Sequence, residues 1–132
     1  MARTKSPEGE PTKSELEILQ ILWANGPSTV RSVNEELNKK REVAYTSTLK
    51  IMQLMHEKGM VLRDNTEMTH VYFAALKEEP TKKFLLQRFV DSLYNGSTTQ
   101  LMMQLLGESK KSKKELALLK EMLDKLEKET KK

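Results

Sequence analysis

Apolar positions along the chain predict a first helix between Thr12 and Gly26. They form a wide stripe, as one buried face of a helix requires, and comprise Leu16, Ile18, Leu19, Ile21, Leu22 and Trp23. Thr12 and Glu15 have the spacing of a capping box, in which the threonine oxygen accepts a hydrogen bond from an amide of the first turn. Gly26 and Pro27 end this helix, because glycine permits the terminating conformation and proline cannot continue a helix.

Two further helices are predicted before residue 60. A short one begins at Ser28–Thr29 and has an apolar stripe made of Val30, Val33 and Leu37. Residues 43–59 read VAYTSTLKIMQLMHEKG and end at a glycine. Their buried face, at helical spacing, comprises Thr48, Ile51, Met52 and Met55, and the opposite polar face comprises Thr46, Ser47, Lys50, Gln53 and Glu57.

The periodicity changes after residue 59. Residues 60–63 and 69–74 are β-prone runs, and the polar stretch DNTEM between them suits a turn. We therefore predict a hairpin. Three short helices followed by an antiparallel ribbon make a winged helix-turn-helix, in which the third helix is presented outward and the ribbon flanks it. The predicted fold class is mainly α.

The rest of the chain is predicted to be helical. Apolar side chains line one side as far as Asn95–Gly96, a second short helix follows, and a polar stretch at 109–114 precedes the last helix. In that last helix the leucines recur at steps of three and four residues, at Leu116, Leu119, Leu123 and Leu126. This seam is too short to form a stable coiled coil alone, so it needs a partner surface.

Composition excludes several classes of chemistry. A chain of 132 residues holds one domain, or a small domain with an appendage. It has no cysteine, which removes disulfides, thiolate metal sites and a cysteine nucleophile. No nucleophile–base pair or phosphate-binding glycine loop is present, and His56 and His70 lack a ligand pattern. We expect neither an enzyme nor a bound cofactor or metal.

Membrane insertion is not expected either. No apolar run approaches the length of roughly eighteen residues that a membrane span needs, and the first residues carry no secretory signal. The predicted location is the cytoplasm.

Charge gives no direct indication of a partner. The net charge is +4, but Lys+Arg and Asp+Glu balance at 7 and 7 in residues 1–43, at 3 and 3 in 44–76 and at 4 and 4 in 77–108. The surplus lies in residues 109–132, with 9 basic and 5 acidic residues. A DNA-binding hypothesis must therefore rest on the arrangement of side chains and not on a basic patch.

Four stretches together resemble a known family. They are TKSELEILQILWANGPSTVRSVNEEL at 12–37, VAYTSTLKIMQLMHEKGMV at 43–61, VYFAAL at 71–76 and FVDSLYNGS at 89–97. In this order and at these separations they resemble the penicillinase-repressor (BlaI/MecI/CopY-type) transcriptional regulators. The resemblance implies a dimeric repressor that binds a palindromic double-stranded DNA operator. Several such proteins are inactivated when a membrane-embedded sensor protease cuts their dimerisation domain.

The resemblance implies a domain organisation and an interface. We expect a flexible arm at 1–11, a winged-helix DNA-binding domain at 12–76 and a helical dimerisation domain at 77–132. The expected homodimer contacts are Phe84, Phe89, Leu93, Leu101, Leu105, Leu116, Leu119, Leu123 and Leu126. The scissile Asn–Phe pair of the family aligns with Gln104–Leu105, so cleavage by a homologous sensor is left open.

Candidate DNA contacts lie mainly at the start of the third helix. Thr46, Ser47 and Lys50 match family positions that face the major groove, and hydroxyls in a first helical turn can reach bases or phosphate. The full set adds candidate phosphate contacts and comprises Arg31, Ser32, Arg41, Tyr45, Thr46, Ser47, Lys50 and Arg63. One alternative is that Thr46 or Ser47 only caps the helix, and another is that the basic residues are solvated surface.

Two features favour a different class of function. The wing tip, often Gly-Arg in relatives, is Glu67-Met68 here, which disfavours a strong phosphate contact. Residues 1–76 carry no net charge. The competing hypothesis is therefore a winged helix that binds another protein without specific DNA binding.

Overall fold

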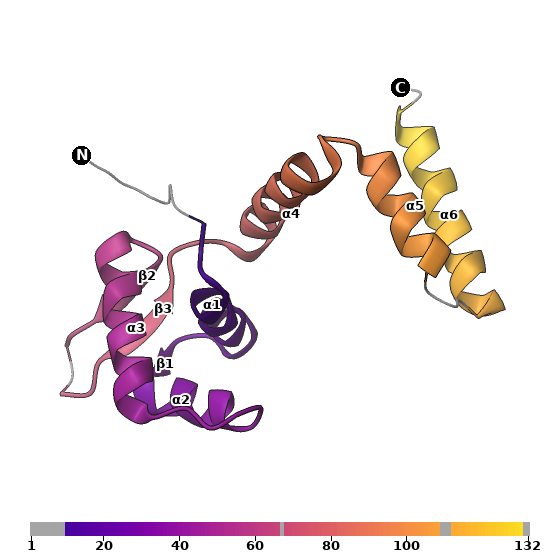
Figure 1. The fold of residues 1–132 in the computed structure, drawn as a ribbon. Helices are drawn as coiled ribbons and strands as arrows, with labels where there is room; N and C mark the ends of the chain where they lie inside the picture. The colour runs from indigo at the N-terminus through magenta and orange to yellow at the C-terminus, as the bar shows by residue number, and fades with distance from the viewer. Residues whose placement is uncertain (1–9, 67, 109–111, 131–132) are drawn as a thin grey trace. The chain divides into compact units, whose positions relative to one another are not determined.

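A computed structural model describes residues 10–66, 68–108 and 112–130 (Figure 1). The chain divides into two compact units, residues 1–85 and 86–132, and the boundary falls within the helix α4 (Glu78–Tyr94). The first unit contains three complete helices, a small sheet and the start of α4, and the described part of the second contains the rest of α4 and two more helices. The predicted arm at 1–11 lies largely outside the described residues.

Local sequence signals account for the helices of the first unit. In α1 (Lys13–Asn25) the predicted capping box is present, with Thr12 Oγ1 accepting from the Glu15 amide at 3.2 Å and Glu15 Oε1 accepting from the Thr12 amide at 2.9 Å. The helix ends at Gly26, whose φ of +81° favours glycine. The next helix, α2 (Val30–Asn38), is capped by Thr29.

The third helix, α3 (Tyr45–Lys58), ends as predicted. Gly59 adopts the left-handed conformation with φ +84° and ψ +9°, and the Met60 amide donates to the Met55 carbonyl at 2.9 Å. Thr48, Met52 and Met55 on its predicted inner face are fully buried.

The predicted hairpin is confirmed and belongs to a three-stranded sheet. The strands are β1 (Ser28–Thr29), β2 (Val61–Asp64) and β3 (Val71–Ala74), in the antiparallel order β1-β3-β2. Tyr72 of β3 pairs with Ser28 on one side and with Arg63 on the other. The strand β1 was not predicted, because a two-residue strand shows no alternation of polar and apolar positions.

One core joins these elements. It consists of Ile18, Leu19, Leu22, Val30, Val33, Leu37, Met52, Met55, Met60, Val61 and Tyr72. Trp23 packs against this core and donates from Nε1 to the Leu76 carbonyl at 2.9 Å, which ties α1 to the chain after β3. The mainly α, winged-helix fold is confirmed.

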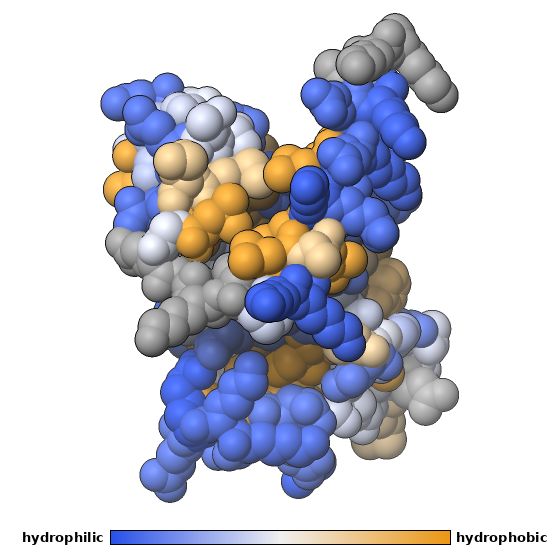
Figure 2. All heavy atoms as spheres, turned by 90° about the vertical axis from the view of Figure 1, so that its right-hand side faces the viewer, coloured by the Kyte–Doolittle hydropathy of each residue, from blue (hydrophilic) through white to orange (hydrophobic). Residues whose placement is uncertain are grey.

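The second unit buries much less of its apolar surface. It comprises the rest of α4, α5 (Thr98–Glu108) and α6 (Lys113–Thr130), and its buried apolar side chains are Val90 and Leu101. Figure 2, which views the molecule from the side of α5 and α6, shows apolar surface open among hydrophilic side chains. No helix in the described part of the chain is long and apolar enough to span a membrane.

Candidate nucleic-acid interface

The first turn of α3 presents polar side chains to solvent. Tyr45 is 46% exposed, and Thr46, Ser47 and Lys50 are also exposed. The N-cap is Ala44, which makes no side-chain capping hydrogen bond. Thr46 and Ser47 therefore do not cap α3, and their hydroxyls make no hydrogen bond to another described residue that would hold them against the protein.

Two asparagines of α2 hold the start of α3 in place. Asn34 Nδ2 donates to the hydroxyl of the fully buried Thr48 at 2.8 Å and to the Val43 carbonyl at 3.0 Å. Asn38 accepts from the Val43 amide at 3.1 Å and donates to the Val43 carbonyl at 2.9 Å. Sequence reasoning missed this clamp, although two asparagines four residues apart on a helix are a signal that it could have used.

Arg41, a predicted phosphate contact, is engaged within the protein. Its Nη1 and Nη2 donate to the two carboxylate oxygens of Glu17, each at 2.7 Å. The hydrogen bond and the charge of Glu17 raise the pKa of Arg41. In turn, the hydrogen bond from Arg41 lowers the pKa of Glu17. Glu17 therefore competes with a phosphate for this arginine, because it takes two of the five N–H donors and neutralises the charge.

Arg31 and Arg63 line a groove of about 350 Å³ between the start of α2, α3 and the wing. The groove is also lined by Tyr45, Gln53 and His70, so it adjoins the polar turn of α3. Ser32, the remaining candidate on α2, is exposed, and its amide donates to the Thr29 hydroxyl at 3.1 Å.

Arg63 is held against Tyr72. Its guanidinium carbon lies 5.9 Å from the centroid of the Tyr72 ring, and Nη1 donates to the Tyr72 hydroxyl at 3.4 Å. Its Nε is buried and has no hydrogen-bond partner among the described residues. The arginine is therefore oriented but not fully satisfied.

The wing tip is described only in part. Glu67 lies outside the described residues, and Met68 is fully exposed. Asp64 Oδ1 accepts from the Thr66 amide at 2.9 Å, and this hydrogen bond lowers the pKa of the carboxyl.

Most of the predicted dimer contacts are exposed in the single chain. The exposed ones are Phe84, Phe89, Leu93, Leu105, Leu116, Leu123 and Leu126, with exposed fractions between 46% and 60%. Leu119 is half-buried, and Leu101 is buried within its own unit, at 9% exposed. Leu101 thus belongs to the interior of the single chain.

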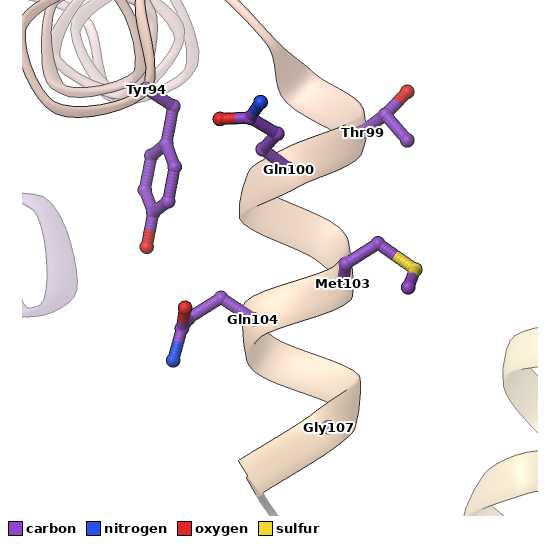
Figure 3. Close-up of a pocket in the computed structure, with 6 residues that line it drawn as sticks. All are labelled: Tyr94, Thr99, Gln100, Met103, Gln104 and Gly107. Carbon is purple, nitrogen blue, oxygen red and sulfur yellow. The ribbon is translucent and has the colours of Figure 1, made fainter.

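The predicted cleavage pair, Gln104 and Leu105, lies inside α5. Gln104 lines an open depression of about 510 Å³, together with Tyr94, Gln100 and Met103. Figure 3 shows Gln100 and Gln104 projecting from α5 on the side of Tyr94, with Met103 on the other side. Among the residues that the structure describes, no three His, Asp or Glu side chains gather as a metal site would require.

Comparison with known proteins supplies a family context. Residues 11–125 match the penicillinase repressor family. Two proteins of Mycobacterium tuberculosis, from strains CDC 1551 and H37Rv, are each named transcriptional regulator BlaI and are 34% identical over 59 residues. The matched segment is 44% of this chain and 43% of theirs, so the similarity spans less than half the length of these relatives.

A solved structure shares the fold. A MarR family protein from Bacillus stearothermophilus superposes with a TM-score of 0.50 at 19% sequence identity, covering 92% of this chain and 76% of that one. At this identity the likeness concerns the fold alone.

Proposed function

This chain belongs to the penicillinase repressor family, and from that premise we propose that it is a DNA-binding transcriptional repressor that binds a palindromic operator as a homodimer. The observation that carries the proposal is the exposed, uncapped start of α3, where Thr46 and Ser47 lie in the first turn and Lys50 follows one turn later. A function of this kind needs no catalytic residue.

The chemistry of this turn suits a duplex. The first amides of a helix have no intrahelical acceptor and carry a partial positive charge, which attracts phosphate. Short hydroxyls such as those of Thr46 and Ser47 reach base edges or phosphate oxygens without steric cost. Lys50 lies one turn further on, where it can bind guanine or phosphate in the major groove. The Tyr45 hydroxyl suits a phosphate.

The proposed phosphate contacts make binding depend on salt. Arg31, Ser32, Arg41 and Arg63 flank the proposed recognition turn. If each half-site supplies roughly three to five phosphate contacts, a dimer should lose on the order of 10³–10⁵ in affinity between 50 and 200 mM salt. An affinity independent of salt would contradict the proposal.

Dimerisation compensates for weak half-site binding. We propose that residues 77–132 form the dimerisation domain and residues 12–76 the DNA-binding domain. The exposed leucines of α6 support this, because a leucine seam left open to solvent needs a partner. Joining two half-sites raises the effective concentration of the second, so the dimer binds far more tightly than a monomer.

A mobility-shift assay on the chain's own promoter tests DNA binding. The double variant Thr46→Ala with Lys50→Ala should lose the operator complex while circular dichroism and sedimentation stay unchanged, because both side chains are exposed. Lys83→Ala, on an exposed face of α4, removes the same charge away from α3 and should bind normally. Equal binding by the double variant would overturn the assignment of the recognition face.

Sedimentation tests the dimer. Leu119→Lys with Leu123→Lys places charges at the proposed interface and should produce monomers with much weaker DNA binding. The first unit should remain folded, because neither residue belongs to its core. A variant that sediments like the parent would remove the α6 seam from the interface.

We further propose that proteolysis in the dimerisation domain relieves repression, through a membrane-bound sensor protease. The alignment of the family's scissile pair with Gln104–Leu105 supports this, and Leu105 is 55% exposed. Since the pair lies within a helix, α5 must unwind locally to enter a protease. Mass spectrometry after induction should find a fragment ending at residue 104, and an uncut chain in derepressed cells would contradict the mechanism.

Balanced charge supports one competing function. The equal numbers of acidic and basic residues in 1–76 favour a winged helix that binds another protein. In that case the promoter assay should give no specific complex at any salt concentration, even though the chain is folded.

A further inference from the structure

We propose that the groove between the start of α2, α3 and the wing is an oxyanion-binding site, in which Arg31 and Arg63 hold a phosphate or carboxylate group. The ligand has two sources with the same chemistry, a backbone phosphate of DNA or a free small anion. For the DNA phosphate the inference rests on the proposed function, and for the free anion it stands independently.

The described residues that line this groove carry positive charge only. They include two arginines, with the Tyr45 hydroxyl, the Gln53 amide and the His70 ring as further polar groups, and none of these described residues is an aspartate or glutamate. This is unusual in a segment whose acidic and basic residues balance. A concave surface lined by cations and by low-dielectric walls concentrates anions.

Arg31 and Arg63 form no ion pair with a described carboxylate, as is also true of several lysines of the same unit, whereas Arg41 and Lys58 each form one. Arg41 binds Glu17, and Lys58 binds the buried Glu15 with a distance of 2.7 Å between Nζ and Oε2. No ion pair joins Arg31 or Arg63 to an acidic residue in the part of the chain that the structure describes. Their charges are left for a ligand.

Arg63 is oriented for such a ligand. Tyr72 holds one face and one end of its guanidinium, while the buried Nε lacks an acceptor. Buried donors are almost always paired in native proteins, so Arg63 has one unmet hydrogen bond, which a ligand in the groove reaches once the side chain shifts. The planar guanidinium binds phosphate and carboxylate through two parallel hydrogen bonds, and such pairs are among the strongest that side chains make.

The sheet sets the spacing of the two arginines. Arg63 pairs with Tyr72, Tyr72 pairs with Ser28, and Arg31 lies three residues after Ser28 at the start of α2. Backbone hydrogen bonds thus fix the positions of both main chains at the edge of the groove. The Arg63 guanidinium, which Tyr72 already holds, loses less freedom on binding an anion than an unrestrained side chain would.

Nuclear magnetic resonance of the arginine Nε–Hε groups in the full chain tests the site directly. The probe is inorganic phosphate, exchanged for chloride at constant ionic strength. The Arg63 signal, assigned by its loss in Arg63→Lys, should move saturably with phosphate. In Arg31→Gln the phosphate affinity should fall about tenfold, whereas the matched control Lys83→Gln should behave like the parent. A shift that never saturates, or that is the same in Arg31→Gln, would overturn the site.

Promoter DNA distinguishes the two sources. If a backbone phosphate occupies the groove, Arg31→Gln should remove one phosphate contact from each half-site. The slope of log affinity against log salt concentration should then fall in magnitude by about 2 for the dimer. Inorganic phosphate should also compete with DNA more strongly than chloride does at the same ionic strength. If only a free anion binds, the salt dependence should stay unchanged while the phosphate titration still saturates. If the chain forms no complex with promoter DNA, the proposed function is wrong. The phosphate titration then decides by itself whether the groove binds an anion.

Discussion

Removing the carboxylate of Glu17 should strengthen DNA binding. Arg41 is a proposed phosphate contact, yet both ends of its guanidinium are occupied by Glu17 at 2.7 Å. Glu17→Gln takes away the competing anion and leaves the arginine free to turn toward a phosphate. A variant that loses one acidic side chain on α1, away from the proposed recognition turn, thus becomes a tighter DNA binder.

The size of the gain follows from the exposure of the pair. The side chains of Arg41 and Glu17 are 46% and 21% exposed, so the ion pair is partly screened by water. Pairs of this kind shift an equilibrium by a factor of about 1.4 to 5. A dimer contains two copies, which gives roughly a 2- to 30-fold gain in affinity, together with a steeper dependence on salt.

Fluorescence anisotropy on the promoter duplex at several salt concentrations measures both quantities. The decisive control repeats Glu17→Gln in an Arg41→Gln background, where no arginine remains to be released. Glu42→Gln, beside Arg41, removes an equal charge and reports the general electrostatic effect. If the gain persists without Arg41, or if Glu17→Gln gives no more than Glu42→Gln, the competition between Glu17 and phosphate does not exist.

Three further predictions concern stability. Thr48→Val should lower the free energy of unfolding in urea by about 1 kcal/mol, because the Asn34 amide loses one of its two acceptors while the other remains. Gly59→Ala should cost about 1 kcal/mol, measured by thermal unfolding, since φ is +84° and an added Cβ meets no atom within 4 Å, so the cost is backbone strain alone. Arg41→Gln should reduce stability only where Glu17 is ionised. The pKa of Glu17 is lowered in the folded state, so its contribution is complete above the ordinary glutamate pKa and disappears as pH falls through the lowered value; denaturation at stepped pH should show parent and variant converging in acid.

Features that depend on neighbouring residues could be predicted from the sequence. The capping box at Thr12 and the glycine that ends α3 involve only residues close together in the sequence, so the residue types alone were enough to predict them. The inner face of α3 followed in the same way from helical spacing, with Thr48 included even though it is polar.

Features that depend on contacts between distant residues could not be predicted. Arg41 and Glu17 are 24 residues apart in the sequence, and Trp23 and Leu76, which are joined by a hydrogen bond, are 53 residues apart. Nothing in the local pattern names such a partner. For the same reason the sequence could not distinguish Arg41 from Arg63, and both were predicted as phosphate contacts. In the structure Arg41 is paired with a carboxylate, whereas Arg63 lies over a tyrosine ring.

The pairing of β3 with two strands at once has a consequence for how the wing tolerates insertions. Extra residues in the connection between β2 and β3 lengthen the loop and leave the register intact, so they should cost little. One extra residue inside β3 shifts every later residue of the strand to the opposite face. Tyr72 would then leave the core, and Arg63 would lose the ring on which it rests. Natural variation in the length of this wing should therefore be confined to the loop.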